Sequence, residues 1–434
     1  MKHHLVVKMR RALHEPPRIP DWVSFITDKS APITSVDPDV DAVLHTAGLD
    51  FWVTHEYATA ADGWAAVEIV HGLERTYRLV MQHHEGALPA DLMLRLASLP
   101  SVESAHQLEV GGAEVPDRRT VAVAAAQSLG GRREVPGLDF AQAMTRGRTD
   151  VRVAVLDTGV NLAHPELRGK VVAQADFVDL QGLDTSSFVG DFLGADNDPE
   201  DELGHGTHVA GIIAGEGIDM DPGIVPQCRL MAVRVLATLQ VGKTRQGAGI
   251  VDNINPAIKW AVDRGADVIN MSLGIRHTGG GLPHADVIRY ALARGVTVVA
   301  ASGNDGTDTK YYPGALPGVV AVGATDDAGD VAPFTSYGAR ITVVAPGVNI
   351  LSSFAHGRYA VASGTSQASP CVAGAVALLK SLARDYGTHL GVNDIARILR
   401  ETSDKPDDRL HSVHAGYGVI NMTDAVKSLL DSLN

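Results

Sequence analysis

The sequence is short of cysteine, of long apolar runs and of basic charge, and each shortage excludes a class of protein. Its 434 residues include two cysteines, Cys228 and Cys371, too few for a disulfide framework. We expect both to be buried as small apolar side chains. No apolar run approaches the roughly 20 residues of a membrane-spanning helix. Acidic residues outnumber basic ones by 51 to 37, and the net charge of −14 argues against nucleic acid or an anionic membrane surface as a partner.

The first residues also lack the pattern of a secretory signal. Segment 1–11 carries charges too early to form the apolar core of a signal peptide. The sequence as written therefore predicts a cytoplasmic protein. The alternative is a secreted protein whose signal was removed before residue 1.

Apolar residues make up 45% of the chain, enough for a large core, and the length suggests two or three domains. From residue 151 onward, near-continuous apolar runs alternate with helical patterns, which indicates a parallel sheet covered on both faces. The strand-like runs are 151–156, 231–236, 268–273, 296–301 and 319–324, and the helical patterns are 205–214, 254–264, 285–294, 365–380 and 392–401. We therefore predict an α/β fold with a doubly wound, mainly parallel sheet and ligand-binding residues at the carboxyl ends of its strands.

The most informative stretch is 364–370, which is followed by an apolar run to Leu379. Small residues precede a helical pattern, and Pro370 is tolerated in the first turn of a helix. Ser366 is thus expected at a helix N-terminus, where backbone N–H groups favour developing negative charge. Such a serine can be a nucleophile, or it can be a helix cap with no chemical role.

Three further residues decide between these interpretations. Asp157 ends the strand-like run 151–156, His205 opens a helix of small residues, and Asn304 follows the run 296–301. The order Asp157, His205, Ser366 is one of the known orders of a serine triad. The four segments that carry Asp157, His205, Asn304 and Ser366 are all present and in order. With them, the chain from about Gly137 to its C-terminus resembles the subtilisin-like serine proteases, the subtilases.

The resemblance implies a role for each of these residues. Ser366 would be the nucleophile, His205 the general base and acid, and Asp157 the group that orients the imidazole. Asn304 and the backbone N–H of Ser366 would hold the oxyanion. The Asp-Thr-Gly triplet at Asp157 also occurs in aspartic proteases, but those need two such carboxylates and the chain has one such triplet. Catalysis of this kind needs no cofactor.

The same resemblance implies a substrate site that binds an extended peptide by strand addition. Tyr311 falls at the floor of the primary pocket, which predicts a shallow pocket for small or medium side chains before the cleaved bond; alternatively, Tyr311 turns outward to solvent. The predicted substrate-binding residues are Gly247, Ala248, Gly249, Ser272, Leu273, Gly274, Ala301, Ser302, Gly303 and Tyr311. Gln367 and Cys371 replace a methionine and a histidine usual in the family, and neither supplies catalytic chemistry.

The N-terminal part predicts a separate small α+β domain. A strand at 22–27, a helix at 38–47, a strand at 50–57, one or two strands in 65–82, a helix at 89–97 and a strand at 101–110 give a ferredoxin-like order. The helix at 89–97 is expected to bury Leu92, Leu94 and Leu96. Segment 96–103 resembles the end of subtilase pro-domains, which act as folding chaperones and inhibitors; an unrelated docking domain is the alternative.

We therefore divide the chain into a pro-domain-like unit at 1–112, a linker at 113–136 and a catalytic domain at 137–434. The triplet Ala126-Gln127-Ser128 resembles the first residues of mature subtilisins. This predicts self-cleavage near Ala125–Ala126, with residues 122–125 lying extended in the substrate cleft.

Carboxylates alternate in the turn-rich stretch 191–201, a pattern that suits a calcium ion. It is similar to a medium-affinity calcium loop of heat-stable subtilases, and the predicted ligands of this structural calcium are Asp191, Asp196, Asp198 and Glu200. A solvated acidic loop, or one that favours basic substrate side chains, explains the pattern equally well. The family's high-affinity calcium loop is trimmed here, with Glu166 in place of an aspartate ligand.

Taken together, the residues predict a serine endopeptidase that acts on polypeptides through an acyl-enzyme on Ser366. Its own N-terminal domain would act as an intramolecular inhibitor and chaperone of the precursor. Two alternatives stay open: an intracellular processing protease that retains its N-terminal unit as a docking domain for a peptide precursor, and an inactive subtilase scaffold.

Overall fold

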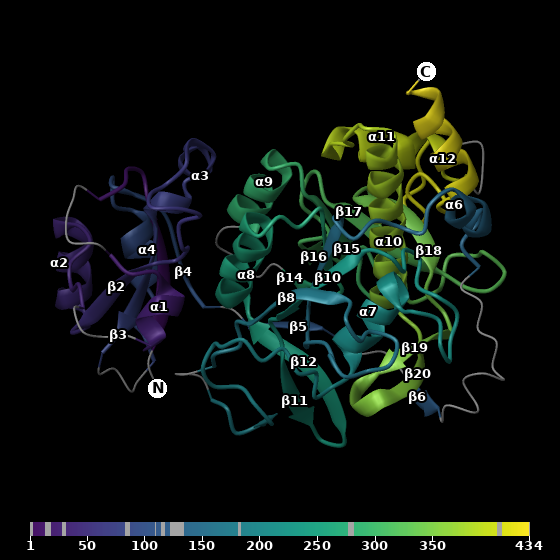
Figure 1. Ribbon diagram of the computed structural model, residues 1–434. Coiled ribbons are helices and arrows are strands. Elements are labelled where there is room, and N and C mark those ends of the chain that lie inside the picture. Colours follow the sequence, from purple (N-terminus) through teal and green to yellow (C-terminus); the bar gives the residue numbers. More distant parts are fainter. Residues whose placement is uncertain are drawn as a thin grey trace.

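The computed structural model describes residues 3–13, 19–27, 32–82, 87–108, 110–113, 118–121, 134–180, 184–276, 282–405 and 410–433 (Figure 1). The predicted cleavage point between Ala125 and Ala126 lies outside these residues.

A seven-stranded parallel sheet forms the centre of the larger unit, in the order β18-β17-β15-β13-β7-β10-β8. The strands are β7 (Arg152–Asp157), β8 (Val171–Asp176), β10 (Arg229–Arg234), β13 (Val268–Met271), β15 (Thr297–Ala301), β17 (Val320–Thr325) and β18 (Ile341–Pro346). The predicted doubly wound α/β fold is confirmed. The edge strand β8 was not predicted, because Gln174 and Asp176 interrupt its apolar run, and β18 was missed although its sequence is apolar.

Helices cover both faces of this sheet, as a parallel sheet requires. On one face lie α6 (Leu138–Met144), α7 (His205–Ala214), α10 (Thr365–Asp385), α11 (Val392–Thr402) and α12 (Met422–Asp431), and on the other α8 (Val251–Asp263) and α9 (Ala285–Ala293). Each face has its own apolar core, centred on α7 and α10 in one case and on α8 and α9 in the other. The long helix α10 is buried along most of its length.

The N-terminal unit is built on a four-stranded antiparallel sheet in the order β2-β3-β1-β4. Its elements are β1 (His4–Met9), α1 (Trp22–Thr27), α2 (Pro38–Thr46), β2 (Phe51–His55), α3 (Ala66–Val70), β3 (Thr76–Met81), α4 (Leu92–Ala97) and β4 (Val102–Gln107). This is the predicted ferredoxin-like arrangement, but its first strand is β1, and the segment predicted as that strand is helix α1. Residues 65–82, predicted as one or two strands, hold helix α3 before strand β3. Leu94, predicted to be buried, is 75% exposed.

Two small sheets connect the units. Strands β5 (Val110–Ala113), β12 (Thr244–Ile250), β11 (Ala237–Val241) and β9 (Phe188–Val189) form one, and β19 (Ile350–Phe354), β20 (Arg358–Ala362) and β6 (Arg118–Val121) form the other. β14 (Ile275–Arg276) pairs with β16 (Tyr311–Tyr312). Each small sheet thus joins a strand from 110–121 to strands of the larger unit. Figure 1 shows α8 and α9 facing the N-terminal unit.

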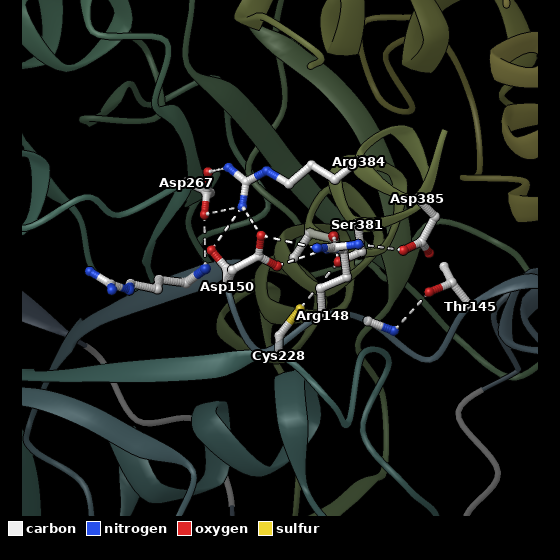
Figure 2. A network of polar contacts seen from close by, with 11 residues as sticks. Thr145, Arg148, Asp150, Cys228, Asp267, Ser381, Arg384 and Asp385 are labelled. Carbon is white, nitrogen blue, oxygen red and sulfur yellow. Dashed lines mark hydrogen bonds and ion pairs between the residues drawn. The ribbon is translucent and has the colours of Figure 1, made fainter. Parts of the chain in front are cut away.

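A network of charged residues fixes the C-terminal end of α10 to the start of the sheet (Figure 2). Arg384 forms an ion pair with Asp267 and donates to the backbone oxygen of Asp150 at 2.8 Å. Arg148 bridges the carboxylates of Asp150 and Asp385, at 2.8 Å in each case. α10 has 21 residues, which places this network about 30 Å from the N-terminal end of the helix. The network therefore holds α10 at the end remote from Ser366.

No helix in the described part of the chain is long and apolar enough to span a membrane. The cytoplasmic location stays a prediction.

Candidate active site

Asp157 and His205 meet at the carboxyl end of strand β7. Asp157 is the last residue of β7, and His205 is the first residue of α7. The His205 Nδ1 atom lies 2.6 Å from the Asp157 Oδ1 atom. Both side chains are almost completely buried, at 0% and 1% exposure. In this pair the carboxylate fixes the orientation of the ring and directs Nε2 away from itself.

A second buried carboxylate, Asp201, holds the N-terminus of α7. Its Oδ2 accepts from the backbone N–H and the hydroxyl of Thr207, at 2.8 and 2.7 Å, and its Oδ1 accepts from the N–H of Gly204 at 2.7 Å. Thr158 donates to Asp201 at 2.8 Å and accepts from the N–H of Gly206 at 2.9 Å. Burial raises the pKa of Asp201. Asp201 therefore positions His205 through the helix. Sequence analysis missed it, because the residue stands at the end of an acidic stretch.

Ser366 lies at the N-terminal end of α10, with Gly364 as the residue that precedes the helix. Its hydroxyl donates to the backbone oxygen of Ser272 at 3.2 Å, while the Ser272 hydroxyl donates to the backbone oxygen of Ser366 at 2.9 Å. Ser366 is 4% exposed. This reciprocal pair joins the start of α10 to the segment that follows β13.

Asn304 is oriented by the residue next to Ser366. Its Oδ1 atom accepts from both the backbone N–H and the hydroxyl of Thr365, each at 2.9 Å. Because the oxygen is engaged on that side, the amide NH₂ group points away from Thr365 and is available as a donor. A donor of this kind beside a nucleophile can stabilise an oxyanion.

The four predicted catalytic residues are brought to one edge of the sheet. Asp157 ends β7, while Ser272 and Asn304 follow the neighbouring strands β13 and β15. The helices α7 and α10, which begin with His205 and with Thr365-Ser366, pack against each other. A carboxylate, an imidazole, a hydroxyl and an amide thus lie at one edge of the sheet, and these are the groups that nucleophilic acyl transfer uses.

The predicted substrate strand, Gly247 to Gly249, lies in β12. Its edge pairs antiparallel with β5 of the same chain, with Gly247 opposite Ala113 and Gly249 opposite Gly111. A Cβ atom on Gly247 would lie 3.0 Å from the side chain of Thr158, the neighbour of Asp157. The Gly247 end of β12 is therefore the end nearer to the Asp157–His205 pair.

Tyr311 packs between the other two predicted substrate segments. A Cβ atom on Gly303 would come within 2.3 Å of the Tyr311 ring, and one on Gly274 would lie 3.0 Å from the Tyr311 Cβ atom. The Tyr311 hydroxyl donates to Asp305 at 2.6 Å and accepts from Arg276 at 3.0 Å. The side chain is half-buried rather than turned fully to solvent. Its ring thus occupies space between Ser272–Gly274 and Ala301–Gly303.

The four predicted calcium ligands make separate local contacts. Asp191 is 3.4 Å from Arg234, and the Asp196 and Asp198 carboxylates accept the N–H groups of Asp198 and Glu200, at 2.7 and 3.1 Å. Glu200 accepts from Asn161 at 2.6 Å. Within the described ranges, no group of three or more histidine, cysteine, aspartate or glutamate side chains is arranged to hold a metal ion. The calcium site stays a prediction.

Glu166 is engaged by its own loop. Its carboxylate accepts the backbone N–H groups of Gly217, Ile218 and Asp219 at 2.7 to 3.1 Å, and the hydroxyl of Tyr359 at 3.1 Å. These donors surround both oxygens with protein N–H and O–H groups. The trimmed loop is thus closed by hydrogen bonds to Glu166.

Both cysteines are fully buried, as expected from the sequence. Burial raises the pKa of Cys228 to about 11, which keeps the thiol protonated at neutral pH. Cys371 lies one turn after Gln367 in α10 and donates to its backbone oxygen at 3.5 Å.

Comparison with known sequences assigns this site to a family. Residues 148–418 match the model of the subtilase family. The thermophilic serine proteinase of Bacillus sp. (strain AK1) is 40% identical over 290 residues, covering 66% of this chain and 64% of that protein. Subtilisin Savinase of Lederbergia lenta is 39% identical over 241 residues, covering 55% and 80%. The intracellular serine protease of Paenibacillus polymyxa is 37% identical over 262 residues, covering 58% and 74%.

A solved structure resembles the fold as well. The prenylagaramide maturation protease PagA is 32% identical, with a TM-score of 0.55. The similarity covers 68% of this chain and 99% of PagA. The resemblance inferred from the sequence blocks is thereby confirmed.

Proposed function

The chain belongs to the subtilase family, and from this premise we propose that it is a serine endopeptidase in which Ser366 forms the acyl-enzyme. The hydrogen bond between His205 and Asp157 carries the proposal. It leaves Nε2 as the ring nitrogen that can accept a proton from a nucleophile.

In the proposed mechanism, His205 removes the proton of the Ser366 hydroxyl as the oxygen attacks the peptide carbonyl. Asp157 stabilises the imidazolium that forms, and His205 then protonates the leaving amine. Asn304 and the N–H of Ser366 stabilise the oxyanion. Water completes hydrolysis of the acyl-enzyme by the same steps in reverse.

We propose that residues 1–112 act as an inhibitory unit on the catalytic residues 137–434, joined by the linker 113–136. Arg78, at 0% exposure, supports this docking: it donates to Glu56 of its own unit at 2.8 and 2.9 Å, and to Asn253 and the backbone oxygen of Asp252 in α8, each at 2.7 Å. Lys8 and Asp286 form a further ion pair between the units, at 2.8 Å.

Strand β5 adds to this inhibition because it covers the predicted substrate strand. A peptide that binds by strand addition needs the edge of β12, and residues 110–113 occupy that edge. The precursor would therefore be inhibited by its own backbone until β5 dissociates from β12.

A second candidate is a processing protease that keeps its N-terminal unit as a docking domain. The ion pair between Lys259 of α8 and Glu68 favours it, because both side chains are nearly fully buried. Separating the units would break this pair and leave Lys259 with Asp263 of α8 as its partner. The similarity to PagA, which is described as a maturation protease, supports this candidate.

We further propose that the primary pocket prefers small side chains before the cleaved bond, because the Tyr311 ring lies between the two segments predicted to form its walls. The pair formed by Arg276 and Asp305 holds the Tyr311 hydroxyl in place. A peptide library varied at this position tests the preference: alanine should exceed phenylalanine and leucine, and the reverse order contradicts it.

The endopeptidase function is tested by Ser366→Ala, with Ser369→Ala as the matched control. Ser369 lies three residues further along α10 and donates to Asn270 at 2.7 Å. Loss of the nucleophile should reduce peptide cleavage by about 10⁶-fold, the scale measured for subtilisin. The Ser369→Ala variant should retain most of its activity. Cleavage that survives in Ser366→Ala would refute the assignment.

Intact-mass analysis and N-terminal sequencing separate the inhibitory unit from the docking domain. An inhibitory unit predicts that the active form has lost residues before the linker. A docking domain predicts an active enzyme of full length.

A further inference from the structure

In the sheet formed by β19, β20 and β6, the edge of β20 that pairs with β6 has no role in the proposed catalytic mechanism. β6 comes from segment 118–121 and pairs antiparallel with β20, with Arg118 opposite Ala362 and Val121 opposite Tyr359. On its other side, β20 pairs with β19. Without β6, the edge of β20 would expose its unpaired backbone groups.

The registers of β5 and β6 give the direction of each strand relative to the active site. Along β12 the chain reaches Ala113 opposite Gly247, the end of β12 beside Thr158 and the triad acid. Along β20 it resumes at Arg118 opposite Ala362, four positions before Ser366. From there it runs away from the nucleophile. Residues 114–117, which join the two strands, lie outside the described residues.

β5 therefore ends at the end of β12 nearer to the Asp157–His205 pair, and β6 begins opposite Ala362 and runs away from Ser366. A substrate that follows the same direction would place the residues before its cleaved bond on β12. The residues after the cleaved bond would lie along β20, antiparallel to it.

We propose that the edge of β20, residues 358–362, is a binding site for the leaving-group side of an extended polypeptide substrate, and that β6 occupies this site in the intact chain. The proposal rests on the proposed endopeptidase function. The ligand is a polypeptide that continues for several residues beyond the cleaved bond in an extended conformation. Short peptides and esters would not reach the site.

β20 is also attached to the helix that carries His205. The His208 Nε2 atom lies 3.1 Å from the backbone oxygens of Ala360 in β20 and of Ile350 in β19. Ser352 and Ser353 of β19 donate to the backbone oxygens of His208 and Thr207, at 2.8 and 2.9 Å. A substrate strand added to β20 would thus lie on a sheet bonded to α7. This contact places the leaving amine in a fixed relation to the imidazole that must protonate it.

A binding experiment tests the site without requiring catalysis. The protein is the full chain with Ser366→Ala, in which residues 110–121 are replaced by a Gly-Ser segment of equal length to open both edges. The probes are fluorescent peptides with the sequence of residues 110–117, which can reach only β12, and of residues 110–121, which can also pair with β20. A third probe carries N-methyl groups on the backbone nitrogens of Arg119 and Thr120, which preserves length and charge but blocks strand pairing.

The 110–121 peptide should bind about tenfold more tightly than the 110–117 peptide, the gain expected from a few added backbone hydrogen bonds. The N-methylated peptide should lose that gain. Equal affinities for all three peptides would overturn the proposal, as would full affinity of the N-methylated one. Since this variant has no nucleophile, a failure of the endopeptidase assignment would show only in the activity of the wild-type chain.

If the opened variant does not fold, the wild-type enzyme gives a second measurement. The specificity constant kcat/KM is compared for substrates that share the residues before the cleaved bond and extend two or six residues beyond it. The longer substrate should be cleaved about tenfold more efficiently. Equal values would overturn the proposal.

Discussion

The N-terminal unit and the catalytic unit bury polar groups in different ways. In the catalytic unit, buried polar groups such as Asp157 and Asp201 bond to neighbours in the same unit, between two apolar cores. At the boundary with the N-terminal unit, charged groups of one unit also have partners in the other, as Lys259 does with Glu68 in addition to Asp263 of its own helix. A cavity of about 340 Å³ at this boundary is lined by residues of both units, among them Lys8 and Asp286.

This difference indicates how each region responds to change. The contacts that Asp157 and Asp201 make with His205, Gly204 and Thr207 lie within the catalytic unit and involve no residue of the N-terminal unit. The boundary between the units is held by ion pairs, and breaking one of them leaves a buried charge, which is costly. We therefore propose that the chain combines a preorganised catalytic site with a cover whose attachment depends on a few side chains. Each variant below changes either the catalytic unit or the boundary between the units.

The largest effect is expected from Asp157→Asn. The asparagine would present an NH₂ group or a neutral oxygen to His205 Nδ1, which removes the preference for the productive tautomer. We expect kcat to fall by about 10⁴-fold with little change in docking of the N-terminal unit. Steady-state kinetics on a peptide substrate measures the loss. Asp196→Asn, in the exposed acidic loop, is the control and should leave kcat unchanged; a similar fall in both variants would contradict the assignment.

The next effect is on the boundary between the units. Arg78→Met removes the partner of Glu56, whose pKa burial already raises to about 7. The variant leaves Glu56 without its buried partner and also loses the two hydrogen bonds from Arg78 to Asn253 and Asp252 of α8, so the boundary should be destabilised by about 3–5 kcal/mol. Hydrogen exchange of α8 and α9 amides reports the undocking.

Arg78→Met combined with Glu56→Gln removes both charges and should recover the part of this loss that comes from the uncompensated Glu56 charge, but not the part that comes from the lost hydrogen bonds to α8. If the double variant is as weakly docked as Arg78→Met alone, the uncompensated charge is not the cause.

A smaller effect, confined to the catalytic unit, concerns Lys380 of α10. Burial lowers its pKa from 10.5 to about 8, and its ammonium group donates to the backbone oxygen of Gly295 at 3.1 Å. Between pH 8 and 10.5 the unfolded chain holds this proton and the folded chain does not. The contribution of Lys380 to stability therefore rises with pH through this window.

Below pH 8 the cost of charging Lys380 is complete, about 3 kcal/mol from the shift in its pKa. Lys380→Met should therefore stabilise the protein most at pH 7, with an advantage that shrinks toward pH 10.5. Denaturant unfolding of both proteins across this range measures the difference. An advantage that stays constant with pH would contradict the prediction.

The smallest expected effect is on selectivity. Tyr311→Gly should deepen the primary pocket and raise kcat/KM for substrates with phenylalanine before the cleaved bond about tenfold relative to alanine. The docking of the N-terminal unit should not change. An unchanged preference would show that the Tyr311 ring does not limit the pocket.

Much of the catalytic unit could be predicted from the sequence, because its buried strands are continuous apolar runs that end in the functional residues. Asp157 and Asn304 were assigned in this way. Asp201 could not be, because its role depends on N–H groups of a helix turn whose position the acidic stretch does not reveal. The pairing of β6 with β20 was equally inaccessible, since backbone pairing between distant segments leaves no periodic pattern.

The N-terminal unit was harder to predict, for reasons visible in two segments. Strand β1 contains Lys8, which looks like a surface residue but is buried by ion pairs with Glu103 and Asp286. Segment 22–27 has the aromatic and β-branched composition of a strand. It is nevertheless helical, because the Asp21 carboxylate accepts the N–H and hydroxyl of Ser24, at 3.1 and 2.6 Å, and caps the first turn.

The most direct test of a preorganised site under a docked cover is the rate at which a fluorophosphonate labels the full-length chain, with the modified residue identified by peptide mapping. We expect labelling of Ser366, slow in the wild-type chain and at least about tenfold faster in Arg78→Met, whose weakened docking exposes the site. Ser366→Ala should not be labelled. Absence of label on Ser366 in both chains would contradict the catalytic assignment, and equal rates would contradict the role of the N-terminal unit as a cover.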